Sequence, residues 1–284
     1  MIAKPDILEL ASELKAEGEM FALATVVRTV SVTAAKAGAR ALIRSDGVVS
    51  DGWIGGGCAK SAVVKAARES MAGGQPQLIS IQPEHLLDEQ GVVAGAELEG
   101  VRFAANHCPS KGTMDIFIEP VLPKPELVIF GSSPVAIALS ELAPSLGYYC
   151  TVCVKDDQRH QFIGVDQVLD GYSKQNTRDR QRFIVISTQG KGDEEAVQQA
   201  LDLPSTFISF VGSKAKAMSL RQKFMEAGSN LDVFDKIKVP AGLDLGAITP
   251  EEIALSILAE ITTIRRKGHR TDIMDASIKT GVAQ

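Results

Sequence analysis

The fold is decided by the stretch Leu127-Val128-Ile129-Phe130-Gly131-Ser132-Ser133-Pro134-Val135-Ala136. Its four apolar residues predict a short buried strand, and Gly131 marks a turn. Ser133 and Pro134 predict the start of a helix, because serine caps helix N-termini and proline suits the first helical position. A strand that turns directly into a helix is the unit from which parallel sheets are built.

The same alternation continues towards the end of the chain. Further strands are expected at 148–154, 182–186 and 207–211, and helices at 134–145, 194–201, 215–227 and 250–265. Strands separated by helices imply βαβ units, and the right-handed crossover rule then leaves a doubly wound sheet. We therefore predict an α/β protein whose C-terminal part is a Rossmann-like domain with a doubly wound parallel sheet.

The first half of the chain has a different pattern, which predicts an α+β domain. Helices are expected at 6–16 and 59–71, and strands at 21–30, 39–44, 77–81 and 113–121, with a hairpin turn at Asp46-Gly47. Prolines 120, 123 and 125 indicate a stiff linker. We place the domain boundary there, which gives an N-terminal domain of residues 1–122 and a Rossmann-like domain of residues 123–284.

Composition and charge exclude several classes of protein. The chain of 284 residues has 30 Lys and Arg against 35 Asp and Glu, a net charge of −5, and 45% hydrophobic residues. This balance excludes wholesale disorder and argues against a nucleic-acid or anionic-membrane binder. The sequence has no apolar run of membrane-spanning length, no secretion signal, and only four cysteines. We expect a cytoplasmic protein with reduced thiols.

A glycine loop is the sharpest chemical signal. Gly55, Gly56 and Gly57 precede Cys58 and a predicted helix. Such a loop presents backbone N–H groups to an anion, and the helix N-terminus lowers the pKa of a thiol. Lys36 and Arg40 lie just upstream and would add positive charge. The alternative interpretations are a tight structural turn with a buried thiol, and a solvated charged face.

The turn after 127–130 has the position of a dinucleotide pyrophosphate site, which would involve Gly131 and Ser133. It has one glycine where the dinucleotide fingerprint has three. Asp156 follows the next strand, where a ribose-binding acid would lie, although Lys155 precedes it. A well-capped structural helix explains the same residues, so both interpretations stay open.

Two further motifs have the spacing of a binding site, one for an anion and one for a metal or redox centre. Gly212, Ser213 and Lys216 repeat the strand, glycine and helix pattern, and a lysine at a helix N-terminus opposes the helix dipole unless an anion is bound there. A second anion site and a plain helix start are both compatible with these residues. Cys150 and Cys153 have the spacing of a redox or zinc motif, but they fall in a predicted strand, where residues three apart point to opposite faces. We therefore expect no metal site.

Several motifs in order resemble the XdhC/CoxI maturation factors of molybdenum hydroxylases, over nearly the whole chain. They are Gly52-Trp53-Ile54-Gly55-Gly56-Gly57-Cys58, Phe117-Ile118-Glu119-Pro120, Val211-Gly212-Ser213, Pro240 with Gly242-Leu243-Asp244, and Pro250-Glu251-Glu252-Ile253-Ala254. Gly131-Ser132-Ser133-Pro134 resembles the CoxI-like branch, where many relatives have Gly-x-Gly-His. Lys60, where an acidic residue is frequent, and Lys111, near Cys108 where a glycine is usual, depart from the family pattern.

The resemblance implies an accessory protein, a chaperone rather than an enzyme, that binds the molybdenum cofactor transiently. The organic part of this cofactor is molybdopterin, a phosphorylated pterin dithiolene. The implied task is to assist sulfuration of the cofactor and its insertion into xanthine dehydrogenase or carbon monoxide dehydrogenase. The implied partners are the hydroxylase apoenzyme, a cysteine desulfurase and a second copy of the chain in a homodimer.

A second hypothesis uses the C-terminal domain alone. The βαβ pattern of residues 126–266 is compatible with an NAD(P)-dependent oxidoreductase, although no proton donor stands out. A third possibility is that this domain binds another nucleotide, such as a cytidine or flavin phosphate.

Overall fold

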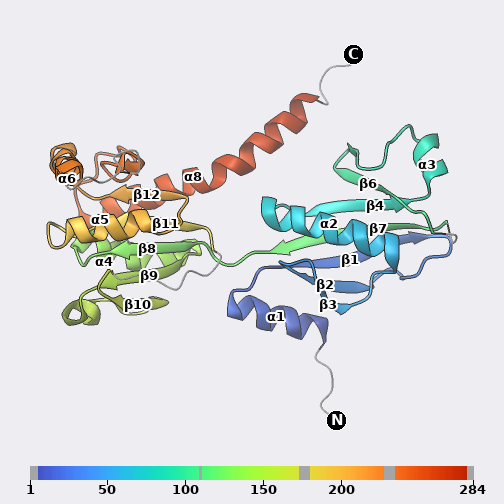
Figure 1. The fold of residues 1–284 in the computed structure, drawn as a ribbon, viewed down its shortest axis with the longest axis horizontal. Coiled ribbons are helices and arrows are strands. Elements are labelled where there is room, and N and C mark those ends of the chain that lie inside the picture. The colour runs from blue at the N-terminus through green and yellow to red at the C-terminus, as the bar shows by residue number, and fades with distance from the viewer. Residues whose placement is uncertain (1–5, 109–110, 173–179, 227–233, 280–284) are drawn as a thin grey trace, which may run out of the picture. The chain divides into compact units, whose positions relative to one another are not determined.

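The computed structural model describes residues 6–108, 111–172, 180–226 and 234–279 (Figure 1). The chain divides into two compact units, residues 1–123 and residues 124–284. Each apolar core cluster among the described residues draws its members from one unit only. Each unit therefore has its own interior.

The first unit is built on a seven-stranded mixed sheet of order β3-β2-β1-β7-β4-β6-β5. Neighbouring strands are antiparallel except β4 and β6, which run parallel. The strands are β1 (Phe21–Val30), β2 (Arg40–Arg44), β3 (Val49–Gly52), β4 (Gln77–Gln82), β5 (Glu97–Leu98), β6 (Val101–Ala105) and β7 (Thr113–Val121).

Two helices cover opposite faces of this sheet (Figure 1). Helix α2 (Gly57–Gly73) packs on the face that carries Ala22 and Ala24, whereas α1 (Ile7–Glu17) packs on the face that carries Phe21 and Leu42. This division follows from the period of two along β1. Gly18 ends α1 in the left-handed conformation, as its position in the sequence predicts.

The second unit is a six-stranded sheet of order β10-β9-β8-β11-β12-β13, and all neighbouring strands are parallel. Counted along this unit, the order is 3-2-1-4-5-6, which is that of the Rossmann fold. The prediction of a Rossmann-like doubly wound sheet is thus confirmed. The strands are β8 (Glu126–Phe130), β9 (Tyr149–Val154), β10 (Gln167–Asp170), β11 (Arg182–Ile186), β12 (Phe207–Phe210) and β13 (Ile237–Lys238).

Helices cover both faces of the second sheet. Helices α4 (Pro134–Leu142) and α8 (Pro250–Lys279) pack on one face, and α5 (Asp193–Asp202) and α6 (Lys214–Glu226) pack on the other. Short 3-10 helices follow α4 (η1, Ala143–Leu146) and β9 (η2, Asp156–Gln161). Helix α4 is shorter than expected because Pro144 cannot continue it.

Several short elements were not expected from the sequence. In the first unit these are α3 (Glu84–Glu89), β5 and β6, and in the second unit they are β10 and β13. Such short strands give too few positions for a period of two to stand out. Helix α8 also continues beyond the expected end at residue 265 and through Gly268, although basic residues followed by glycine are a signal for the end of a helix.

Candidate functional site

Three loops of the first unit converge where β1, β4 and β6 end and β7 begins. A Cβ atom on Gly55 would lie 3.5 Å from Met114 and 3.7 Å from Ala34. One on Gly112 would lie 2.2 Å from the carbonyl oxygen of Val32, which also forms a bridge with Lys111. We call residues 31–39, 53–57, 106–108 and 111–112 the loop edge.

The glycines of this region have different reasons to be glycine. Gly52 has φ +85°, and its Cβ would lie 2.1 Å from the carbonyl oxygen of Arg40, so the fold itself requires it. Gly55 has φ +108°, in the left-handed range. A Cβ on Gly56 or Gly57 would meet nothing within 4 Å. Backbone angle and packing therefore account for Gly52, and backbone angle for Gly55, whereas neither space nor a left-handed φ requires glycine at the last two positions.

Gly56 is the N-cap of α2, and no described side chain caps this helix. The first N–H groups of a helix have no partner within the helix, and they carry the positive end of its dipole. No side chain caps these amides, and no side chain at Gly56 or Gly57 covers them. Their N–H groups can therefore bind an anion.

The two predicted cations lie beside this loop. Lys36 is exposed in the turn before β2, where the amide of Ala39 donates to its carbonyl oxygen at 3.0 Å. Arg40 is exposed at the start of β2, and its carbonyl oxygen accepts a hydrogen bond of 2.8 Å from the amide of Trp53. Within the described part of the chain, neither side chain forms an ion pair, so both charges remain available.

The loop edge also brings a second cysteine close to the glycine loop. Cys58 is the second residue of α2, and its side chain lies outside the described residues. Cys108 is a free thiol, half-buried, whose amide donates to Oδ1 of Asn106 at 3.0 Å. Asn106 in turn donates to the carbonyl oxygen of Gly112 at 2.7 Å. Cys108 was not among the site residues selected from the sequence, although the asparagine two residues before it is a signal for such a loop.

Lys111 stands in the same loop with φ +48°, a left-handed conformation that glycine adopts without strain. This is the position near Cys108 where the sequence resemblance implies glycine.

A cavity of about 390 Å³ opens between α2 and β6, next to the loop edge. Its walls include Ala62 and Ala66 of α2 and Ala104 of β6, while Lys65 and His107 are among its polar residues. It lies wholly within the first unit.

The turn between β8 and α4 in the second unit is closed by its own side chains. Ser133 Oγ lies 2.5 Å from Ser187 Oγ and also accepts from the amide of Ala136 at 3.1 Å. Gly131 has φ +107°, and a Cβ there would lie 2.5 Å from the carbonyl oxygen of Ser187. The hydroxyl of Ser133 thus occupies the helix N-terminus where a pyrophosphate would bind.

The predicted ribose-binding acid lies in η2, directly after β9. The side chain of Asp156 falls outside the described residues. The neighbouring Gln158 accepts a hydrogen bond of 2.7 Å from Ser132 Oγ, which ties η2 to the β8–α4 turn.

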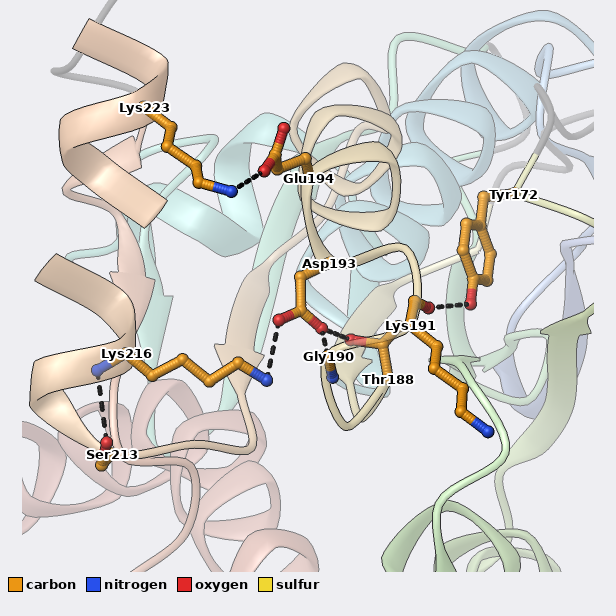
Figure 2. A network of polar contacts seen from close by, with 9 residues as sticks. All are labelled: Tyr172, Thr188, Gly190, Lys191, Asp193, Glu194, Ser213, Lys216 and Lys223. Atoms are coloured by element: carbon orange, nitrogen blue, oxygen red, sulfur yellow. Dashed lines mark hydrogen bonds and ion pairs between the residues drawn. The ribbon is translucent and has the colours of Figure 1, made fainter. Parts of the chain in front are cut away.

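The third predicted anion site holds an anion that belongs to the chain itself. Lys216 Nζ lies 2.7 Å from Oδ2 of Asp193, the first residue of α5 (Figure 2). The amide of Lys216 donates to Ser213 Oγ at 3.2 Å, so Ser213 caps α6. Gly212 lies against the ring of Phe210, since a Cβ there would be 2.4 Å from it. A carboxylate of the protein thus balances the lysine that opposes the helix dipole.

Asp193 is the centre of this network (Figure 2). Burial raises the pKa of its carboxyl group, but hydrogen bonds from Lys216, Thr188 and the amide of Gly190 outweigh that effect and hold the pKa below its ordinary value. Asp193 is therefore charged at neutral pH and joins the loops that follow β11 and β12.

The Cys-x-x-Cys pair of β9 is structural. Cys150 lies in the core on the α4 side of the sheet, and Cys153 in the core on the α5 side, as the strand period predicts. Burial, and then the nearby carboxylates of Asp166 and Glu126, raise the pKa of Cys150 to about 12. Among the described residues, no group of three or more His, Cys, Asp or Glu side chains is arranged to hold a metal ion. No helix in that part of the chain is long and apolar enough to span a bilayer.

The chain is similar to several known proteins. It is 26% identical to the uncharacterised protein YqeB of Escherichia coli strain K12, over 97% of this chain and 49% of that protein. It is 27% identical to a protein of Bacillus subtilis strain 168 named as a probable subunit of xanthine dehydrogenase, over 55% of this chain and 47% of that protein. The chain thus spans about half the length of the curated relatives that it matches. A crystal structure described as a xanthine dehydrogenase from Bacillus halodurans is similar with a TM-score of 0.44 and 19% identity, over 91% of this chain and 95% of that one.

Two family models match separate parts of the chain. Residues 14–82, which include the glycine loop, match the model of the XdhC and CoxI family. Residues 127–261, which form most of the parallel sheet and its helices, match the model of the XdhC Rossmann domain. The matches do not distinguish the XdhC branch from the CoxI branch. Because both units match in order, the chain belongs to the XdhC and CoxI family.

Proposed function

We propose that this protein is an accessory factor that binds the molybdenum cofactor at the loop edge of the first unit and assists its transfer to a molybdenum hydroxylase such as xanthine dehydrogenase. The observation that carries this proposal is the pair Gly56 and Gly57. Their missing side chains leave the N-terminus of α2 open, although the fold does not require glycine at either position.

The residues of the loop edge fit the chemistry of molybdopterin. The phosphate would be held by the amides of Gly55, Gly56 and Gly57 and by Lys36 or Arg40, because helix N-termini and cations both stabilise dianions. Thiolates are suited to soft metal centres, so Cys58 and Cys108 would lie at the dithiolene and molybdenum end. These residues bind and orient the cofactor, and the protein itself performs no catalytic step.

The proposal includes partners. An accessory factor of this kind would release the cofactor to the hydroxylase apoenzyme, receive sulfur from a cysteine desulfurase for its terminal ligand, and act in the cytoplasm as a homodimer. The name of the Bacillus subtilis relative, which refers to xanthine dehydrogenase, supports the choice of hydroxylase.

Trp53 provides a direct test. It is the only tryptophan in the sequence, and its side chain is 60% exposed within the glycine loop. Full-length protein would be titrated under anaerobic conditions with molybdenum cofactor released from a denatured hydroxylase, and the emission of Trp53 recorded. We expect saturable quenching, at least tenfold weaker binding in Cys58→Ser and Lys36→Gln, and unchanged binding in Lys15→Gln, a matched exposed lysine on α1. The absence of saturable binding, or equal affinities in all variants, would contradict the proposal.

A second candidate function rests on the strand order of the second sheet. This order is typical of NAD(P)-dependent oxidoreductases, which bind the dinucleotide at the turn after the first strand. The hydrogen bonds of Ser133 at that turn support a scaffold instead, because they use the helix N-terminus that the pyrophosphate would need. We therefore rank the oxidoreductase below the accessory factor.

A further inference from the structure

The cavity beside α2 is lined mainly by small apolar side chains. Ala62 and Ala66 of α2, Ile79 of β4, and Ala104 and Ala105 of β6 form its walls. Side chains this short leave broad, nearly flat surfaces, which suit the two faces of a planar ring. A volume of about 390 Å³ lies within the range of small-molecule sites.

Polar side chains in the lining are few, and two of them, Lys65 and Arg102, are cationic. Arg102 is held by an ion pair with Glu69, and Nδ1 of His107 lies 3.4 Å from Oε1 of Glu84. Lys65 forms no ion pair with any described residue. Apolar walls with a small number of placed polar groups are typical of sites for heteroaromatic ligands. Lys65 offers N–H donors to a ring whose edge carries acceptors.

The cavity shares His107 with the loop edge, and its lining residues on α2 follow Cys58 along the helix. Residues 58, 61, 62, 65 and 66 follow the i, i+3, i+4, i+7 spacing of one helical stripe, and all but the first line the cavity. The helix rises about 10 Å from Cys58 to Lys65. On the other side, His107 lines the cavity and the next residue is Cys108. The lining residues thus include Ser61, three residues after Cys58 on α2, and His107, the residue before Cys108.

We propose that this cavity binds the pterin ring system of the cofactor, while the loop edge binds the phosphate and dithiolene end. The inference rests on the proposed function and adds an orientation to it. The pyrimidine ring of the pterin is planar and carries a carbonyl oxygen and ring nitrogens on its edge. Its faces match the alanine walls, and its acceptors match Lys65. The pterin ring and the dithiolene lie at opposite ends of the cofactor, and along α2 Cys58 comes first and the residues that line the cavity follow it.

The first experiment fills the cavity. Ala62→Leu places three more carbon atoms in it, whereas the matched control Ala72→Leu makes the same change at an exposed position near the end of α2. Affinities for free pterin, followed by pterin fluorescence, and for the intact cofactor would be measured on both variants. We expect Ala62→Leu to abolish pterin binding and to weaken cofactor binding at least tenfold, with no effect in Ala72→Leu.

The second experiment removes one charge without changing the core. Lys65→Gln is expected to weaken pterin and cofactor binding at least fivefold, and Lys15→Gln to leave both unchanged. Lys65 is exposed, so this variant remains informative if Ala62→Leu fails to fold.

The outcomes separate the two proposals. If the wild type binds the cofactor and both cavity variants bind it equally well, the orientation is wrong and the proposed function stands. If the wild type does not bind the cofactor at all, the proposed function fails, and the orientation fails with it.

Discussion

The ammonium of Lys216 lies 2.7 Å from Oδ2 of Asp193 (Figure 2). It also lies 5.3 Å from the centre of the Phe210 ring. The carboxylate belongs to the start of α5 and the lysine to the start of α6, so one ion pair joins the loops that follow two neighbouring parallel strands. Asp193 also stabilises its own helix, because an acid in the first turn complements the helix dipole.

Asp193→Asn is expected to lower the free energy of unfolding by about 1.5–3 kcal/mol, the range for hydrogen bonds to charged groups. The matched control is Asp235→Asn, which breaks the exposed ion pair with Arg221 and should have a much smaller effect. Urea unfolding at pH 7 measures both. Equal losses in the two variants would show that the Asp193 network is no stronger than a surface pair.

The same carboxylate makes stability depend on pH. Its pKa is held below the ordinary value in the folded state, so its contribution is complete above the pKa of the unfolded chain, about 4, and is lost as the pH falls through the lower, folded pKa. The stability difference between wild type and Asp193→Asn should be constant from about pH 5 to 7 and shrink below about pH 4. A difference that grows in acid would contradict the direction of the pKa shift.

Two glycine substitutions can distinguish an effect on the stability of the fold from an effect on cofactor binding. Gly57→Ala should leave stability unchanged or raise it by up to about 1 kcal/mol, because Gly57 is helical and a Cβ there meets nothing within 4 Å. It should nevertheless weaken cofactor binding, since the new methyl group covers the helix N-terminus. Gly52→Ala should destabilise the fold by more than about 1 kcal/mol, because its φ is +85° and its Cβ would meet Arg40.

Thermal unfolding and cofactor titration of the two glycine variants provide the check. Tight binding by a stable Gly57→Ala variant would show that the open helix N-terminus is not used.

Ser133→Ala removes a buried helix cap together with its contact to Ser187. We expect a loss of about 1–2 kcal/mol, because the amide of Ala136 loses its acceptor and Ser187 loses its partner. Thr249→Ala removes the exposed cap of α8 and should cost less. Chemical denaturation of both variants tests whether the closed β8–α4 turn contributes to stability.

Titration with NADH and NADPH should show no saturable binding at micromolar concentrations. The reason is again the turn itself, where Ser133 Oγ already accepts a hydrogen bond from the amide of Ala136 at the helix N-terminus. Nicotinamide fluorescence measures this directly. Micromolar affinity together with turnover of a small carbonyl compound would favour the oxidoreductase function over the accessory factor.

The cysteines should differ sharply in reactivity. Iodoacetamide at pH 8 is expected to label Cys108, which is half-buried, and to leave Cys150 and Cys153 unmodified until the protein is denatured. Both are fully buried, and a pKa of about 12 leaves Cys150 almost without thiolate. Peptide mapping by mass spectrometry distinguishes the sites. Labelling of Cys150 in the native protein would mean that the core of the second unit opens easily.

Much of the fold could be predicted because each long element carries its own period and its own stop signal. The strand Phe21–Val30 and the helix that ends at Gly18 are examples, and the opposite faces of Cys150 and Cys153 follow from the same period. Strand β6 was missed because its five residues include two alanines and an arginine, which favour no period.

The candidate site was only partly accessible to prediction, because spacing along the chain does not reveal which loops meet. Gly57 and Lys36 come from neighbouring segments and were selected together, whereas Cys108 joins them only through the contacts of Gly112 with Val32 and of Gly55 with Met114. The sequence suggested a bound anion at Lys216, but no local pattern identifies that anion as Asp193, 23 residues earlier.

The separate interiors of the two units have a consequence for core substitutions. A gene divided after the codon for Pro123 would encode two pieces, each with a complete sheet and the helices that shield it. A substitution in the core of either piece would thus replace a side chain that packs against residues of the same piece, because each core cluster of the described residues belongs to one unit.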